Sequence, residues 1–167
     1  MSGPSFQLIL LAALLVPAIL FFLTQQNTLK LIRKENRDLH PALVWLQIIP
    51  LFNLYWIFVV VTRIADGISK EKVALQDDSI LGIPDYDAVK GVGKRPTYKI
   101  GMAWCILYLC FFGILIVFNL FATPNSTEND TFLAIFSPLF GLAITTCWII
   151  YWVKLVSEKR KLTTLHP

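Results

Sequence analysis

The sequence predicts an all-α integral membrane protein, a single membrane domain over residues 1–167 built as a four-helix transmembrane bundle. Of the 167 residues, 56% are hydrophobic and 16% are charged, and the mean hydropathy is +0.62. A soluble domain usually carries about 25% charged residues. Charge is also missing from long windows, whereas the apolar runs of buried core helices usually stop after about 10–14 residues. Composition and run length therefore disfavour a soluble protein.

Four segments have the length and apolarity of membrane-spanning helices, which need about 20 apolar residues. They cover residues 6–23, 41–64, 100–122 and 132–153, and residues 65–99 form the predicted cytoplasmic loop. The first segment lacks the basic leader and the small-residue cleavage site of a secretory signal, so we expect it to be retained. The third and fourth segments contain no charged residue, and the second contains only Arg63, at its end.

Lys and Arg residues in the connections predict the orientation, because such residues tend to stay in the cytoplasm. The N-terminus and the connection before the fourth segment have none. Residues 30–37 carry four, residues 63–99 carry seven and the tail from 154 carries four. If all four segments span, placing both termini in the cytoplasm leaves eleven basic residues inside and four outside. The C-terminus is therefore predicted to be cytoplasmic.

Pro50, near the middle of the second segment, allows two topologies. We expect a spanning helix kinked at Pro50, with the carbonyl of Leu46 deprived of its usual donor and Asn36 outside, because 24 residues suit a span. The alternative is three spans plus a re-entrant hairpin bent at residues 50–53. The hairpin puts all fifteen basic residues inside, but it must hold bent backbone at membrane depth.

The region after the second segment has a helical pattern. Its apolar residues share one face, which predicts an amphipathic extension lying either along the membrane surface or against its own bundle. Asp66 and Lys70 are spaced for an i,i+4 ion pair. Lys94, Arg95 and Lys99 precede the third segment, where we expect them to contact anionic lipid headgroups.

The sequence shows no catalytic constellation. His40 and His166 have no neighbouring ligand partner, and Cys105, Cys110 and Cys147 lack zinc-site and disulfide spacing. The "GVGK" run at 91–94 lacks the first glycine of a phosphate loop. We therefore expect no enzyme activity, cofactor, metal or nucleic-acid partner.

Four polar residues inside the segments remain as candidates: Asn53, Asn119, Thr145 and Thr146. If buried singly between helices they suit an accessory or scaffold subunit, whose partners are the lipid bilayer and other membrane subunits or itself. If they share a wet face they suit the alternative, a homo-oligomeric channel or small-solute carrier. Asn125 and Asn129 match the glycosylation pattern, which matters only in a eukaryotic secretory membrane.

One stretch carries a resemblance. Residues 40–71, "HPALVWLQIIPLFNLYWIFVVVTRIADGISKE", resemble small bacterial multi-span membrane proteins that are grouped as a domain of unknown function. In that group a tryptophan, an isoleucine-proline pair and an asparagine recur in one helix, which is followed by a helix leaving the membrane. The resemblance implies a bacterial inner-membrane protein, and it implies no activity and no functional residues.

Overall fold

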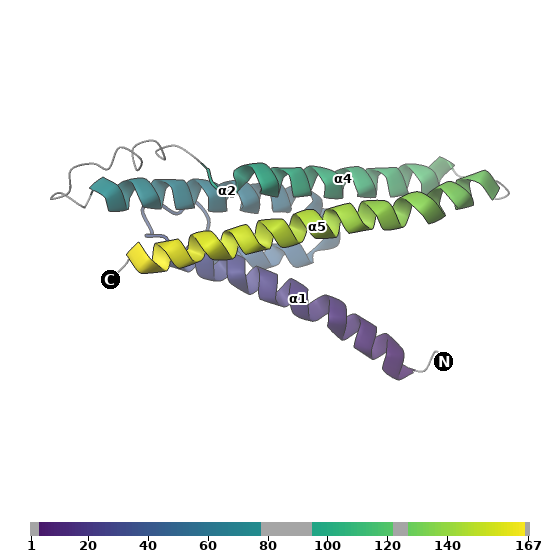
Figure 1. The fold of residues 1–167 in the computed structure, drawn as a ribbon, viewed down its shortest axis with the longest axis horizontal. Coiled ribbons are helices and arrows are strands. Elements are labelled where there is room, and N and C mark those ends of the chain that lie inside the picture. The colour runs from purple at the N-terminus through teal and green to yellow at the C-terminus, as the bar shows by residue number, and fades with distance from the viewer. Residues whose placement is uncertain (1–3, 78–94, 122–126, 166–167) are drawn as a thin grey trace.

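The computed structural model describes residues 4–77, 95–121 and 127–165, and within these ranges every regular element is a helix. The predicted all-α class is therefore confirmed. Figure 1 shows the elements as a bundle in which most helices run along one long axis. The elements are α1 (Pro4–Leu31), the 3-10 helix η1 (Pro41–Ile48), α2 (Pro50–Asp77), α4 (Tyr98–Phe121) and α5 (Thr127–Leu165).

Several of these helices have membrane-crossing dimensions. Within the described residues, three stretches are long and apolar enough to cross a bilayer: Pro50–Leu75, Tyr98–Phe118 and Phe136–Thr164. The latter two lie in α4 and α5 and overlap predicted segments three and four. Helix α1 covers predicted segment one and has 28 residues, or about 42 Å at 1.5 Å per residue. Most side chains at the start of α1 lie outside the part of the chain that the structure describes.

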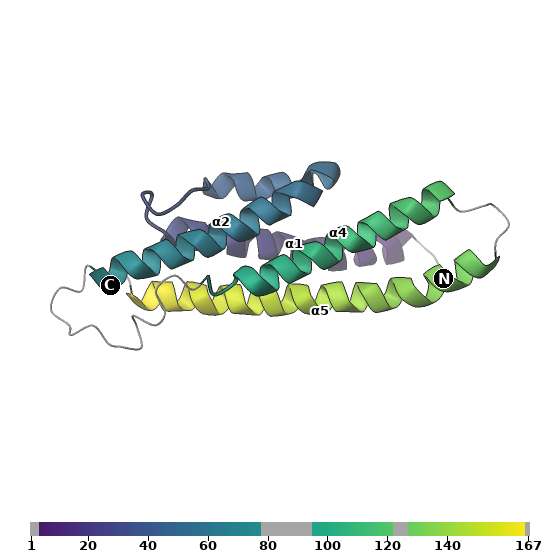
Figure 2. The ribbon, with the colours of Figure 1, turned by 90° about the horizontal axis from the view of Figure 1, so that it is seen from above.

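The structure differs from the prediction mainly in the second segment. It is not one kinked helix over 41–64 but two helices, η1 and α2, which fold back on each other (Figure 2). The cause is Pro50, whose ring disfavours the helical conformation of the residue before it. Ile49 is accordingly extended, with φ −78° and ψ 112°. Pro50 then occupies the first position of α2, where the missing N–H costs no helical hydrogen bond.

Hydrogen bonds satisfy several of the backbone polar groups at the bend. Pro50 cannot donate to the carbonyl of Leu46, so the predicted break in the helical ladder is confirmed. That carbonyl nevertheless accepts a hydrogen bond from the Ile49 N–H at 3.2 Å. The Trp56 indole N–H reaches back across the bend to the carbonyl of Leu43, at 2.8 Å. The indole thus connects α2 to η1 across the bend.

The fold-back gives the molecule one polar end and one apolar end. Helix α1 runs toward the polar end, the η1–α2 hairpin leaves and returns to it, and α5 finishes there (Figure 1). The start of α1 points toward the opposite end, where α4 finishes and α5 begins. The loop of residues 32–40 therefore lies beside the C-terminal half of α2. The two pack so closely at Gly67 that a Cβ added there would lie 2.9 Å from Ile32 Cδ1.

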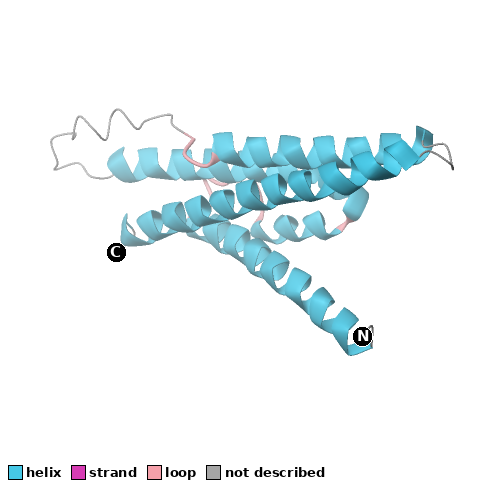
Figure 3. Cartoon of the chain, turned by 45° about the vertical axis from the view of Figure 1, so that its right-hand side comes forward, coloured by secondary structure: helices cyan, strands magenta, loops and turns pink. Residues whose placement is uncertain are grey.

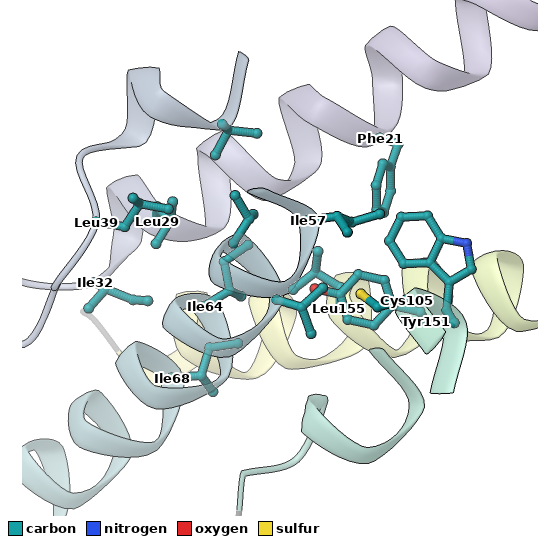
Figure 4. Packing of buried hydrophobic residues seen from close by; sticks show 14 of the residues in the cluster. Phe21, Leu29, Ile32, Leu39, Ile57, Ile64, Ile68, Cys105, Tyr151 and Leu155 are labelled. Carbon is teal, nitrogen blue, oxygen red and sulfur yellow. The ribbon is translucent and has the colours of Figure 1, made fainter. Parts of the chain in front are cut away.

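The hydrophobic core lies in the half of the bundle nearer the polar end (Figure 4). Ile64 and Ile68 of α2 are fully buried there, with Tyr151 and Leu155 of α5. The predicted amphipathic extension therefore packs against its own bundle. Phe21 of α1 sits within an aromatic cluster, with ring centroids 5.5–6.0 Å from those of Trp104, Trp148, Tyr151 and Trp152.

Helix α1 leaves this core at its N-terminal half. Figures 1 and 3 both show it diverging from the paired helices α4 and α5. Leu15 and Val16 of this half and Ile19 just after it are exposed, as are Leu120 of α4 and Leu142 of α5. Large apolar side chains thus cover the outside of the helices away from the polar end.

Candidate functional site

A buried carboxylate at the polar end connects the loop of residues 32–40 to α2. The Glu71 side chain has no exposed surface. Its Oε1 accepts from Arg33 Nε at 3.0 Å, and its Oε2 accepts from the Arg33 backbone N–H at 3.1 Å and from Asn36 Nδ2 at 2.7 Å. Both oxygens are therefore satisfied by charge-assisted bonds, which are about twice as strong as neutral ones. Glu71 fixes the loop on the C-terminal half of α2.

A second buried carboxylate connects α2 to α5. Glu158 of α5 is 4% exposed. It forms ion pairs with Lys72 of α2 and with Lys161 of its own helix, the latter at 2.9 Å. Because Lys72 comes from another helix, this pair holds the C-terminal ends of α2 and α5 together.

Three further ion pairs, made by the partly exposed acids Asp38 and Asp66, complete the polar end. Asp38 pairs with Lys70 at 2.8 Å and with Arg63 at 3.4 Å. The hydrogen bond from Lys70 lowers the pKa of the Asp38 carboxyl below its usual value. Asp66 pairs with Arg95 at 2.6 Å. The Asp66–Lys70 pair predicted within α2 is thus wrong, because each residue pairs instead with a residue outside α2.

These contacts suit cross-linking rather than catalysis. The buried carboxylates of Glu71 and Glu158 are both bound to cations, so neither is available as a general base. The described ranges contain no group of three or more side chains that could hold a metal ion. Removing the cation of such a pair would cost about 3–5 kcal/mol, because the carboxylate would stay buried without its partner.

A second polar centre lies deeper in the bundle, between α1, η1 and α5. Gln47 of η1 donates through Nε2 to Gln25 Oε1 of α1 at 2.7 Å, and both side chains are buried. Gln25 also lies beside the buried phenol of Tyr151. Trp152 of α5 donates to Thr24 Oγ1 at 3.1 Å. Hydrogen bonds thus hold η1, the first arm of the hairpin, against α1 and hold α1 against α5.

The four polar residues selected from the sequence do not converge. The Asn53 side chain lies beside Tyr108 of α4, with its Oδ1 buried. Thr145 and Thr146 are exposed on α5, and their hydroxyls donate to the carbonyls of Gly141 and Leu142 in their own helix. The side chain of Asn119 lies outside the description. The described members therefore form no shared face.

The predicted headgroup residues have different surroundings. Arg95 pairs with Asp66, and its guanidinium lies 5.2 Å from the ring centroid of Tyr98. Lys99 is exposed, and Lys94 lies outside the described residues. Nothing in these contacts tests binding to lipid, so that role stays a prediction.

The sequence analysis overlooked the buried acids, although a signal was present. Glu71 falls on the face of α2 that carries Ile64 and Ile68, and Glu158 falls on the face of α5 that carries Tyr151 and Leu155. A carboxylate at a core position of a helix needs a partner from another element. An acidic residue within an apolar stripe of a helix therefore predicts a buried ion pair with another element.

Comparisons of the chain with protein-family models, with curated proteins and with solved structures find no match.

Proposed function

We propose that this chain is a non-enzymatic integral membrane protein that serves as an accessory or scaffold subunit of a membrane assembly. The polar end and the C-terminus face the cytoplasm. The resemblance of residues 40–71 favours a bacterial inner membrane.

The proposed topology has three spans, α1, α4 and α5, and one re-entrant hairpin, η1–α2. In this topology all fifteen Lys and Arg residues of the chain lie on the cytoplasmic side. The contacts of Glu71 with Arg33 and Asn36 support it, because they place the loop of residues 32–40 at the same end as the C-terminal half of α2. Although Pro50–Leu75 is long enough to cross a bilayer, its charge-free part before Arg63 covers 13 residues, or about 20 Å, and the proposal places only this part within the bilayer.

The observation that carries the scaffold proposal is the apolar tip of this hairpin. Leu51 is 83% exposed and Tyr55 is 68% exposed, and Ile48 and Ile49 beside them are also exposed. Within the bend, the Ile49 N–H donates to the Leu46 carbonyl and the Asn53 N–H donates to the Ile49 carbonyl, which lowers the cost of placing the bend at membrane depth. The ion pairs at the base hold the hairpin in one position. A fixed apolar tip within the bilayer suits docking against a helix of another subunit.

The channel or carrier alternative receives less support. Thr145 and Thr146 are exposed on α5 and satisfied within their own helix. Ionisable groups that drive transport usually lie at membrane depth, whereas the two buried acids, Glu71 and Glu158, are bound to cations at the polar end. A common polar path is therefore not assembled from the described candidates.

Gentle extraction followed by native mass measurement tests the proposal. We expect the intact chain to leave the membrane in a hetero-complex, so that the measured mass exceeds 19.0 kDa by the mass of other subunits. A ring of identical copies would instead favour a channel. A monomer under every mild extraction condition would contradict a subunit role.

A photo-crosslinking residue at position 51 sharpens this test. The matched control is position 142 on α5, because Leu142 is 71% exposed and is also apolar. We expect protein adducts from position 51 and mainly lipid adducts from position 142. Equal protein adducts at both positions would remove the special role of the hairpin tip.

A further inference from the structure

A groove runs along the outer face of α5 near the polar end. It has a volume of about 500 Å³ and is lined by Trp152, Val153, Val156, Ser157, Arg160 and Lys161. Val153, Val156, Ser157 and Arg160 lie on the opposite side of α5 from its buried residues Tyr151, Leu155 and Leu162, and Trp152 and Lys161 lie at the two borders of that side. The groove therefore faces the surroundings of the protein rather than its core.

The chemistry of the groove changes along its length in the same order as that of a membrane lipid. Trp152, Val153 and Val156 make one end apolar, and Arg160 and Lys161 make the other end cationic. The two ends are about 13 Å apart along the helix. In the proposed orientation the apolar end points into the bilayer and the cationic end points toward the cytoplasm.

The depth and direction of the cations fit a lipid phosphate. Lys154 is the first charged residue after the apolar run of α5, so it marks the edge of the hydrocarbon region. Arg160 lies about 9 Å farther along the helix. Long side chains of a helix point back toward its N-terminus, which here is the direction of the membrane. The guanidinium of Arg160 can therefore return to the level of the headgroups.

Arg160 is also available to bind an anion. None of the described residues forms an ion pair or a hydrogen bond with its side chain, whereas Lys161 pairs with Glu158 at 2.9 Å. Ser157 adds a hydroxyl donor between the apolar end and the cationic end. Planar, multidentate donors such as the guanidinium of arginine suit phosphate oxygens.

We propose that the α5 groove binds the phosphate headgroup of an anionic phospholipid, with Arg160 as the principal contact and with the first acyl carbons against Val153 and Val156. The site rests on the proposed membrane location. It is separate from the headgroup residues predicted near residue 95, because it lies on a different helix.

Lipid binding by the full-length protein in mild detergent tests the site. Native mass spectrometry would count phosphatidylglycerol and phosphatidylcholine bound to the wild type, to R160Q/K161Q and to K154Q/K159Q. The second double variant is the matched control, because it removes the same charge from the same helix outside the groove. We expect R160Q/K161Q to lose about tenfold in phosphatidylglycerol affinity, and K154Q/K159Q to lose less than threefold. Phosphatidylcholine should bind weakly to all three proteins.

Three results would overturn the site. Equal losses in the two double variants would mean that general surface charge attracts the lipid. Full displacement of phosphatidylglycerol by an equal concentration of glycerol 3-phosphate would identify a soluble phosphate ligand instead. Equal binding of phosphatidylcholine would remove the role of headgroup charge. None of these results would alter the mass of the native assembly, so failure of the site is distinguishable from failure of the proposed function.

Discussion

Replacing Glu71 with alanine will lower the free energy of unfolding by about 1–3 kcal/mol, because it removes the charge-assisted hydrogen bonds of a fully buried carboxylate. The two oxygens of Glu71 accept three hydrogen bonds from the loop of residues 32–40, and Glu71→Ala removes all of them together. Thermal and denaturant unfolding of the purified protein in mild detergent would measure the loss.

The matched control for this prediction is Asp38→Ala. Asp38 also bonds across to α2, through Lys70, but the side chains of both partners are partly exposed. Exposed ion pairs contribute about 0–1 kcal/mol, so Asp38→Ala should change stability little. If the two variants lose stability equally, Glu71 is not the group that holds the loop on α2.

Replacing Gly101 with alanine will destabilise the contact between α2, α4 and α5. A Cβ at this position would lie 2.5 Å from Val61 Cγ1 of α2 and 2.9 Å from Tyr151 Cε2 of α5. Val61 is β-branched and Tyr151 is fully buried, so neither side chain can move aside easily. Forcing an extra carbon into a packed interior costs about 1–3 kcal/mol.

Gly113→Ala is the control, because Gly113 lies in the same helix and no atom would lie within 4 Å of its Cβ. Both variants gain up to about 1 kcal/mol of helix propensity. The difference between their unfolding free energies therefore isolates the close packing at Gly101. Equal stabilisation in both variants would mean that α2, α4 and α5 do not approach closely at this point.

The all-α class and most helix positions could be predicted, because long apolar runs have few other solutions. The path of the chain at Pro50 could not be predicted from length and proline chemistry alone. A proline in the middle of a run permits both a kink and a fold-back. The contacts that decide between them join residues on either side of the bend, such as the hydrogen bond between Trp56 and Leu43, and residues farther apart in the sequence, such as the ion pair between Arg33 and Glu71.

The candidate sites were less predictable than the fold. Asn53, Thr145 and Thr146 were selected because they are polar within apolar segments, yet the two threonines are satisfied by their own helix. The residues that join elements are instead the buried acids and the Gln25–Gln47 pair. Their roles depend on which helices are neighbours. The count of Lys and Arg residues did indicate that the loop of residues 32–40 lies at the same end as the C-terminal half of α2, since only the hairpin placed every basic residue at one end.

Cysteine accessibility at position 35 tests the central claim, the re-entrant hairpin, most directly. Glu35 is exposed in the loop of residues 32–40, and the structure shows no ion pair for it in the described part of the chain. The variants are Glu35→Cys, Ser126→Cys and Ser157→Cys, each made after replacement of Cys105, Cys110 and Cys147. An impermeant thiol reagent would then be applied to intact cells and to permeabilised cells.

The hairpin predicts that intact cells label only at position 126, in the connection between α4 and α5. Positions 35 and 157 should label only after permeabilisation, because the loop of residues 32–40 shares a side with the C-terminal part of α5. A kinked second span predicts the opposite result at position 35. Labelling at positions 35 and 126 in intact cells, with position 157 protected, would contradict the hairpin.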